Sequence, residues 1–143
     1  IIMPQLSVII PVYNEESSLK ELNQKLLSVL TSLNLEFEVF YIDDGSSDES
    51  LDLLSSFSKE TPQIHIISFY RNFGQTSAIN AGLQAVSGDL IVALDADLQN
   101  DPGDIPLLIN KLKEGYDVVS GWRKNRKDPY FTKKLPSKIA NKI

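Results

Sequence analysis

Two aspartates, Asp95 and Asp97, follow an apolar run at residues 90–94 and are separated only by Ala96. An unbroken run of this length predicts a strand that is buried on both faces of a sheet. Carboxylates directly after it place charge at the carboxyl edge, where open α/β sheets bind ligands. Together with Gln99, they offer the oxygen ligands that Mg²⁺ or Mn²⁺ takes alongside substrate phosphates. The alternative for so short a motif is a polar loop that only caps the strand.

Other apolar runs of strand length alternate with segments of helical periodicity. The predicted strands are residues 6–12, 37–42, 64–69, 90–94 and 116–120. Helices are predicted to start at Ser17 or Ser18, after a Ser46/Glu49 capping box, near Thr76 and after residues 101–104. Small residues in the third helix would let it pack closely on the sheet. This alternation predicts an α/β fold with a mainly parallel, doubly wound sheet and helices on both faces.

Polar residues follow four of these strands, at residues 13–15, 43–44, 71–72 and 95–99. Because the strands are expected to be parallel, the four segments should meet at one edge of the sheet. An ordinary α/β protein also places polar loops there. Four successive strands that end in acid, amide or arginine side chains exceed what solubility requires, so a binding site is predicted at this edge.

Composition excludes several classes of protein. The chain has 143 residues, the size of one domain, and no cysteine, which rules out a disulfide framework and a thiolate metal site. The single histidine, His65, lies inside a predicted strand, so a structural role is expected rather than catalysis. Neither a GxxxxGK[ST] loop nor a GxGxxG turn is present, which argues against P-loop kinases and Rossmann dehydrogenases.

Charge is distributed unevenly along the chain. Residues 1–121 hold 6 Lys or Arg and 18 Asp or Glu, whereas residues 122–143 hold 8 basic residues and one acidic residue. A basic segment on an acidic body indicates an anionic partner such as a phosphate, a membrane surface or nucleic acid. No signal peptide or transmembrane run is recognised. The chain stops inside a patterned segment, so we expect it to be a fragment of a longer protein.

Four segments resemble the successive motifs of family 2 glycosyltransferases: LSVIIPVYNE (6–15), DDGSSD (43–48), RNFGQ (71–75) and DADLQ (95–99). More closely, the chain is similar to the polyprenyl-phosphate glycosyltransferases, which include dolichol-phosphate mannose synthase and bacterial undecaprenyl-phosphate glucosyl- and aminoarabinosyltransferases. The resemblance covers nearly all of residues 5–143. It implies a Rossmann-like GT-A fold and transfer of one sugar from a nucleotide-sugar to a lipid phosphate.

The resemblance also implies a nucleotide-sugar site in residues 1–121, the expected GT-A core. Pro11, Tyr13 and Glu15 would line the pocket for the nucleobase and ribose. Asp44, with Asp43 behind it, would hydrogen-bond the base or the ribose.

A metal site is implied by the DXD motif. Asp95, Asp97 and Gln99 would hold Mg²⁺ or Mn²⁺ and the diphosphate, with Asp97 the first candidate for a direct ligand and a catalytic residue. Arg71 would lie near the nucleotide, or would instead pair with one of the aspartates of the DDGSSD segment. The metal would stabilise the diphosphate leaving group as a Lewis acid.

Residues 122–143 are expected to contact the acceptor and a membrane. Arg123 and Arg126 are candidates for binding the acceptor phosphate, because a guanidinium matches phosphate oxygens bidentately. A solvated basic run is the alternative. Leu135, Ile139 and Ile143 recur every four residues among lysines, a pattern typical of a basic amphipathic helix on an anionic membrane. The cytoplasmic face of a membrane is the expected location.

The sequence thus predicts a metal-dependent, inverting glycosyltransferase that loads a sugar onto a polyprenyl phosphate, with Arg123 as a second catalytic residue. The wording of the RNFGQ and DADLQ segments resembles the bacterial UDP-sugar branch, so UDP-glucose is the first donor considered. The alternatives are a GDP-mannose-dependent dolichyl-phosphate mannosyltransferase, an enzyme with a saccharide acceptor, and a non-catalytic nucleotide-sugar-binding module. Nucleic acid is not expected as a partner. The oligomeric state is not predicted.

Overall fold

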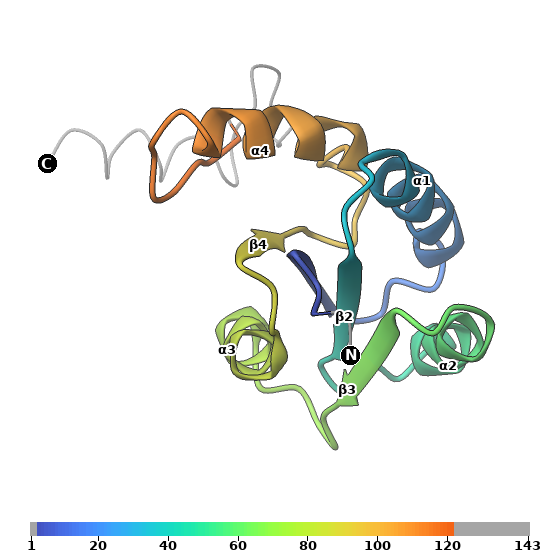
Figure 1. Cartoon of the computed structure of the whole chain (residues 1–143). Helices are drawn as coiled ribbons and strands as arrows, with labels where there is room; N and C mark the ends of the chain where they lie inside the picture. Colours follow the sequence, from blue (N-terminus) through green and yellow to red (C-terminus); the bar gives the residue numbers. More distant parts are fainter. Residues whose placement is uncertain (1–2, 122–143) are drawn as a thin grey trace, which may run out of the picture.

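The computed structural model describes residues 3–121, in which parallel strands alternate with helices (Figure 1). The elements are β1 (Leu6–Val12), α1 (Leu19–Ser32), β2 (Phe37–Asp43), α2 (Ser50–Glu60), β3 (Ile64–Ser68), α3 (Gln75–Ala85), β4 (Leu90–Ala93), the 3₁₀-helix η1 (Pro102–Asp104) and α4 (Ile105–Leu112). The strands lie in the order β3-β2-β1-β4, and each neighbouring pair is parallel. The parallel α/β sheet predicted from the sequence is confirmed.

Side chains of β1 alternate between two layers of helices. Val8 and Ile10 belong to the larger core, on the side of α1 and α2, whereas Ile9 packs with Ile42 and Ala78 on the side of α3. Figure 1 shows α1 and α2 on one face of the sheet and α3 on the other. The central strand β1 is therefore buried from both sides, as a continuous apolar run requires.

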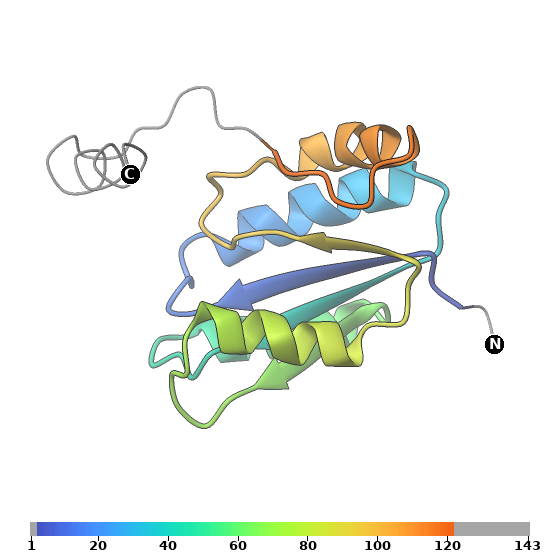
Figure 2. The same ribbon diagram turned by 90° about the vertical axis from the view of Figure 1, so that its left-hand side faces the viewer.

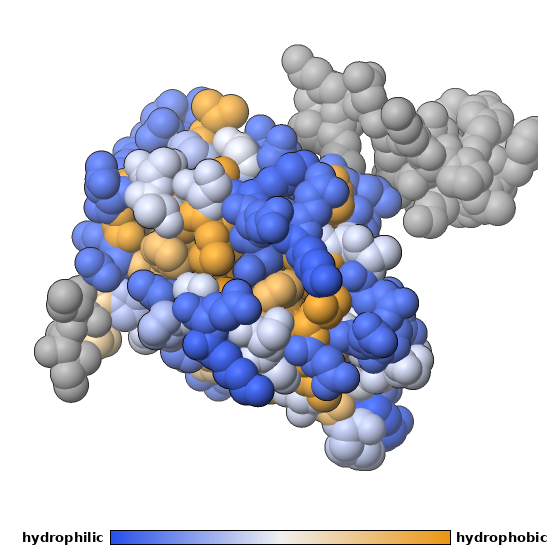
Figure 3. Space-filling model, turned by 90° about the vertical axis from the view of Figure 1, so that its right-hand side faces the viewer, coloured by the Kyte–Doolittle hydropathy of each residue, from blue (hydrophilic) through white to orange (hydrophobic). Residues whose placement is uncertain are grey.

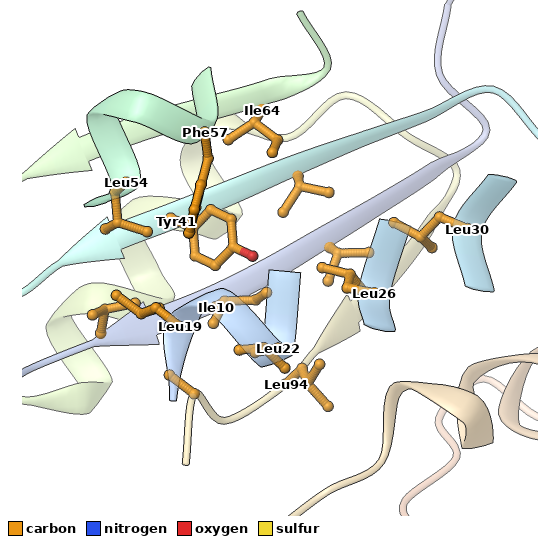
Figure 4. Packing of buried hydrophobic residues seen from close by; sticks show 14 of the residues in the cluster. Ile10, Leu19, Leu22, Leu26, Leu30, Tyr41, Leu54, Phe57, Ile64 and Leu94 are labelled. Carbon is orange, nitrogen blue, oxygen red and sulfur yellow. The ribbon is translucent and has the colours of Figure 1, made fainter. Parts of the chain in front are cut away.

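The larger core depends on the regular leucine spacing of α1. Leu19, Leu22, Leu26 and Leu30 are at most 1% exposed, and Figure 4 shows them on the same side of the sheet as Tyr41. The Tyr41 hydroxyl donates a 3.0 Å hydrogen bond to the side-chain oxygen of Asn23, while burial raises the pKa of Tyr41. Hydrophilic side chains cover much of the surface in Figure 3, which views the molecule from the side of these helices. The helices are amphipathic, as predicted.

Helix α3 packs closely against β1 because it carries small side chains where it meets the sheet. Ala78 is fully buried, and a Cβ added at Gly82 would lie 2.5 Å from Cγ2 of Ile9. Such a contact is too short for any larger residue unless the Ile9 side chain or the helix shifts. The close approach predicted from the small residues of this helix is confirmed.

Strand β4 differs from the prediction in its burial. It pairs only with β1 among the described residues, so it lies at an edge of the sheet rather than at its centre. It is not buried on both faces: Leu90 and Val92 are partly buried, Ala93 is exposed and Ile91 is 46% exposed. The reason is that α3 packs on β1 and β2 and leaves the same face of β4 uncovered.

No strand forms at residues 116–120, so this prediction is wrong. Among the described residues the segment pairs with no strand, and its Tyr116 and Val118 side chains are 53% and 83% exposed. Without a neighbour to accept its backbone hydrogen bonds, a short apolar stretch gains nothing from strand geometry.

The predicted capping box between Ser46 and Glu49 is also wrong. Glu49 occupies the N-cap position of α2 and makes no side-chain capping hydrogen bond. The Ser46 hydroxyl instead accepts a 3.0 Å hydrogen bond from the backbone N–H of Asn14. A contact between two loops has replaced a local cap. Among residues 3–121, no helix is both long enough and apolar enough to cross a bilayer.

Candidate functional site

A pocket of about 330 Å³ opens at the carboxyl edge of the sheet, where the loops after β1, β2, β3 and β4 meet. Figure 2 shows the strands pointing toward this common end. Residues of all four loops, together with the end of β1 and the first residue of α3, line it: Pro11, Val12, Tyr13, Glu15, Asp44, Asn72, Gly74, Gln75, Asp95, Ala96 and Asp97. The structure thus brings together the four polar segments that the sequence placed at one edge.

The charge of this lining is unbalanced. It contains the carboxylates Glu15, Asp44, Asp95 and Asp97, and no Lys, Arg or His among the described residues that line it. An anionic ligand such as a diphosphate cannot enter such a pocket favourably unless a cation accompanies it. The lining therefore suits a ligand pair made of a divalent cation and a phosphorylated molecule.

Asp44 has a structural role in addition to its place in the pocket wall. It is only 3% exposed, and its two carboxylate oxygens accept hydrogen bonds from the backbone N–H groups of Phe73, at 2.7 Å, and Gly74, at 2.9 Å. These charge-assisted bonds fix the end of the loop that precedes α3. A nucleobase or ribose donor would share a carboxylate that is already hydrogen-bonded within the protein.

Gly45 explains how this loop approaches so closely. Its φ is +69°, and a Cβ at this position would lie 2.4 Å from the carbonyl carbon of Arg71 and 2.7 Å from the backbone nitrogen of Asn72. Only glycine satisfies both the backbone conformation and the contact. The Asp43-Asp44-Gly45 sequence therefore allows the loop after β3 to pack in direct contact with the loop after β2.

Asp43 lies behind Asp44, as expected, and does not line the pocket. Its side chain is 1% exposed and accepts hydrogen bonds from the Ser68 hydroxyl at 3.2 Å and the Ser46 backbone N–H at 3.3 Å. Both contacts join the loop after β2 to its surroundings. Asp44 alone of these two residues lines the pocket, and Asp43 holds the loop behind it; contact of either with a nucleotide stays a prediction.

Arg71 is turned away from the pocket. Its guanidinium carbon lies 4.2 Å from the centroid of the Phe73 ring, and its Nε donates a 3.2 Å hydrogen bond to the Tyr70 hydroxyl. It forms no ion pair with Asp43 or Asp44 within residues 3–121. Stacking on an aromatic ring holds the guanidinium outside the pocket lining, so the predicted pairing with an aspartate is not seen among the described residues, while the position near the nucleotide stays a prediction.

The loop after β1 is attached to the loop after β2. The side-chain oxygen of Asn14 accepts a 2.8 Å hydrogen bond from the backbone N–H of Ser47, and the backbone N–H of Glu15 donates to the Ser50 hydroxyl at 2.9 Å. Asn14 adopts a φ of 54°, which asparagine tolerates better than most residues. Tyr13 is left 49% exposed at the pocket wall, where its ring offers a surface for stacking.

The two aspartates of the DXD motif both line the pocket, whereas Gln99 does not. Asp95 accepts hydrogen bonds from the amide of Gln75 at 2.9 Å and the amide of Asn100 at 3.2 Å. Asp97 is exposed and accepts the backbone N–H of Gln99 at 3.0 Å. No group of three or more His, Cys, Asp or Glu side chains gathers for a metal in the described part of the chain. Two carboxylates are nevertheless a sufficient protein contribution for Mg²⁺ or Mn²⁺ when phosphates supply further ligands.

Sequence reasoning missed pocket residues that follow Arg71. Gly74 and Gln75 line the pocket but were not singled out, and Asn72, which was expected at this edge, lines it without having been given a role of its own. The available signal was their position, since they follow the third strand at the same edge as the other polar segments. Arg123 and Arg126, and the rest of the basic segment 122–143, lie outside the described residues.

The glycosyl transferase family 2 model matches residues 7–143. This chain belongs to that family. It is also 48% identical, over 141 residues, to undecaprenyl-phosphate 4-deoxy-4-formamido-L-arabinose transferase of Enterobacter sp. (strain 638). The match covers 97% of this chain and 42% of the relative, so the chain spans less than half the length of that protein.

Solved glycosyltransferase structures share the fold of this family 2 chain. S. aureus TarS 1–349 in complex with UDP-GlcNAc aligns with a TM-score of 0.61 at 22% identity, over 85% of this chain and 38% of TarS. The mannosyltransferase PcManGT from Pyrobaculum calidifontis, in complex with GDP-Man and Mn²⁺, aligns with a TM-score of 0.54 at 23% identity. The alignment covers 67% of this chain and 28% of the PcManGT chain. The GT-A fold expected from the sequence is confirmed.

Proposed function

We propose that this chain is the nucleotide-sugar-binding part of an enzyme that transfers a sugar to a polyprenyl phosphate. The proposal depends on the pocket at the ends of the strands. Four carboxylates line it, and none of its described lining residues is basic. A nucleoside diphosphate with a divalent cation matches that charge. The 48% identical relative, named as an undecaprenyl-phosphate transferase, supports the choice of a lipid phosphate as acceptor.

The nucleoside is proposed to bind along the loops after β1 and β2. Pro11, Tyr13 and Glu15 form one wall of the pocket, and the buried Asp44 faces the same space. The exposed Tyr13 ring can stack on a base, while Glu15 and Asp44 can accept hydrogen bonds from base or ribose donors. Asp43 acts from behind by holding its own loop in place.

The diphosphate and cation are proposed to bind at Asp95 and Asp97. Mg²⁺ or Mn²⁺, when bound, would neutralise the charge that develops on the departing diphosphate. The described residues contribute by presenting two carboxylates at one side of the pocket, of which Asp97 is the more exposed. Gln99 donates its backbone N–H to Asp97 and so supports this loop; its predicted role as a ligand stays a proposal.

The acceptor step is proposed to invert the sugar's anomeric centre. An oxygen of the ionised acceptor phosphate forms the new bond to the anomeric carbon as the bond to the nucleoside diphosphate breaks on the opposite face. No proton has to be removed from the acceptor, so no catalytic base is required. Arg123 and Arg126 are proposed to hold the acceptor phosphate, and the basic segment 122–143 to rest on an anionic membrane at its cytoplasmic face.

The donor sugar has two candidates. Sequence wording favoured UDP-glucose, whereas the name of the 48% identical relative favours a 4-deoxy-4-formamido-L-arabinose donor. We test the 4-deoxy-4-formamido-L-arabinose donor first, because the 48% identity to that relative extends over 97% of this chain. Calorimetric titration of both UDP-sugars and of GDP-mannose, with and without Mn²⁺, distinguishes them. Tightest binding of GDP-mannose would overturn the UDP assignment.

The acceptor assignment is tested with Arg123→Ala and Arg123→Lys in the full-length protein. Lysine keeps the charge but loses the bidentate fork, so both variants should transfer sugar to undecaprenyl phosphate much more slowly than the parent. Donor affinity, measured separately, should barely change. Transfer by Arg123→Ala at the parent rate would contradict the acceptor role, and a loss of donor affinity would move Arg123 to the donor site.

A further inference from the structure

We infer that Gln75 is a positioning residue that orients the Asp95 carboxylate for the cation and diphosphate. Its amide nitrogen donates a 2.9 Å hydrogen bond to Oδ1 of Asp95, and both residues line the pocket. The inference deepens the proposed function and rests on it. Within the RNFGQ segment, the sequence suggested a role for Arg71 and none for Gln75.

An amide suits this task for an electrostatic reason. The pocket wall holds four carboxylates and no basic side chain among the described residues. A lysine or arginine beside Asp95 would fix its orientation but would also cancel the charge that attracts a cation. Gln75 donates a hydrogen bond without carrying charge, so Asp95 is held in place and keeps its full negative charge.

The backbone that carries Gln75 is itself held rigidly. Gln75 is the first residue of α3 and follows Gly74, whose φ is 96°. The buried Asp44 accepts the backbone N–H of Gly74 at 2.9 Å. A chain of direct contacts therefore runs from Asp44 through Gly74 and Gln75 to Asp95, across the loops after β2, β3 and β4.

Asp95 is held from its other side as well. Its Oδ2 accepts a 3.2 Å hydrogen bond from the side-chain amide of Asn100. Two amides thus fix the plane of the Asp95 carboxylate. Because this side chain is already ordered, it loses less conformational entropy when a cation binds. Asp97 is more exposed and is held by a backbone N–H only two residues away. Loss of Gln75 should therefore act mainly through Asp95.

The test uses Gln75→Met, which keeps the length of the side chain but removes the donor, in the full-length protein. Gln84→Met is the matched control, because Gln84 lies on the same helix and is exposed. The first readout is Mn²⁺ binding in the presence of UDP, which is detected as the loss of the paramagnetic resonance signal of free Mn²⁺. The second readout is the thermal unfolding temperature. Gln75→Met should raise the Mn²⁺ concentration at half-saturation about 10-fold, the lower range for partners that orient metal ligands. The control should match the parent.

A double-mutant cycle separates positioning from a purely structural link. If Gln75 acts through Asp95, then adding Gln75→Met to Asp95→Asn should change Mn²⁺ binding no further than Asp95→Asn alone. Parent-like Mn²⁺ binding by Gln75→Met, with or without a lower unfolding temperature, would overturn the inference while leaving the proposed function in place. Equal effects of Gln75→Met in the two backgrounds would also overturn it. Failure of the parent to bind Mn²⁺ with UDP would overturn both.

Discussion

The hydroxyl of Ser18 donates a 2.7 Å hydrogen bond to the carbonyl oxygen of Ala96, 78 residues further along the chain. This bond joins the loop after β1 to the loop after β4. Other hydrogen bonds join the remaining neighbours around the pocket: Asn14 with Ser47, Asp44 with Gly74, and Gln75 with Asp95. The four loops therefore form a closed ring of hydrogen bonds, which holds the pocket walls in position before any ligand binds.

Replacing Ser18 by alanine should loosen this ring at one point. Ser18 is 8% exposed, and the variant leaves the Ala96 carbonyl without the hydroxyl that now donates to it. We expect the free energy of unfolding to fall by about 1 kcal/mol, measured by urea denaturation. Ser17→Ala is the control, because Ser17 is exposed and its loss should change stability by less than about 0.5 kcal/mol. Equal stabilities of the two variants would contradict the structural role of the Ser18 bond.

Most of the fold follows from local patterns in the sequence. The first strand was predicted at residues 6–12, which are its observed bounds. Its apolar residues show no helical spacing that would compete with the strand prediction. Strand order does not follow from such patterns. Residues 90–94 read as a doubly buried strand, yet β4 lies at the edge, since the choice of neighbours and the coverage by α3 depend on packing. The same dependence explains why residues 116–120 form no strand.

The candidate site was predictable to the extent that topology fixes it. Residues directly after parallel strands must meet at one edge, which placed Glu15, Asp44, Asp95 and Asp97 correctly in the pocket wall. The direction of a long side chain is not fixed in that way. Arg71 follows β3 in the predicted loop, but stacking on Phe73 turns it away from the pocket.

Glu38 gives the fold a pH dependence at the end of the sheet opposite the pocket. Burial alone would raise its pKa, but hydrogen bonds from Ser7 and Ser87, at 2.6 Å and 2.7 Å, lower the pKa below 4.5 overall. A carboxylate whose pKa is lower in the folded state than in the unfolded state stabilises the protein at pH values above its unfolded-state pKa. This contribution should be lost as pH falls below 4.5 through the folded pKa.

The variant Glu38→Gln should remove that contribution. We expect lower stability at pH 7 and a weaker decline in stability below pH 4.5 than in the parent, measured by urea denaturation at a series of pH values. Glu36→Gln is the control, because Glu36 is exposed. An unchanged pH profile in Glu38→Gln would show that this carboxylate does not contribute to acid destabilisation.

Asp44→Asn should weaken both the fold and nucleotide binding. The amide keeps only one acceptor oxygen, so one of the backbone N–H groups of Phe73 and Gly74 faces an NH₂ group instead. We expect unfolding to become about 1–3 kcal/mol easier and UDP affinity to fall by about 1–3 kcal/mol, the range for hydrogen bonds to charged groups. Urea denaturation and calorimetry measure the two effects.

The control for this variant is Asp52→Asn, an exposed aspartate of α2. Loss of stability with unchanged UDP affinity would show that Asp44 only anchors the loop after β2 to the loop before α3. Loss of affinity with unchanged stability would show the converse, that the two backbone bonds contribute little.

Asp97→Ala should remove the contribution of the cation while leaving the fold intact. Asp97 is exposed at the pocket wall and lies outside the hydrophobic core, and its described side-chain hydrogen bond is the local one from the Gln99 backbone. Stability should therefore change by less than about 1 kcal/mol. UDP affinity in Mn²⁺ should fall to the level measured in EDTA, because one of the two proposed carboxylate ligands is gone. Asp89→Ala, which removes an exposed aspartate just before β4, should keep the full effect of Mn²⁺. If Mn²⁺ strengthens UDP binding equally in Asp97→Ala and the parent, Asp97 does not hold the cation.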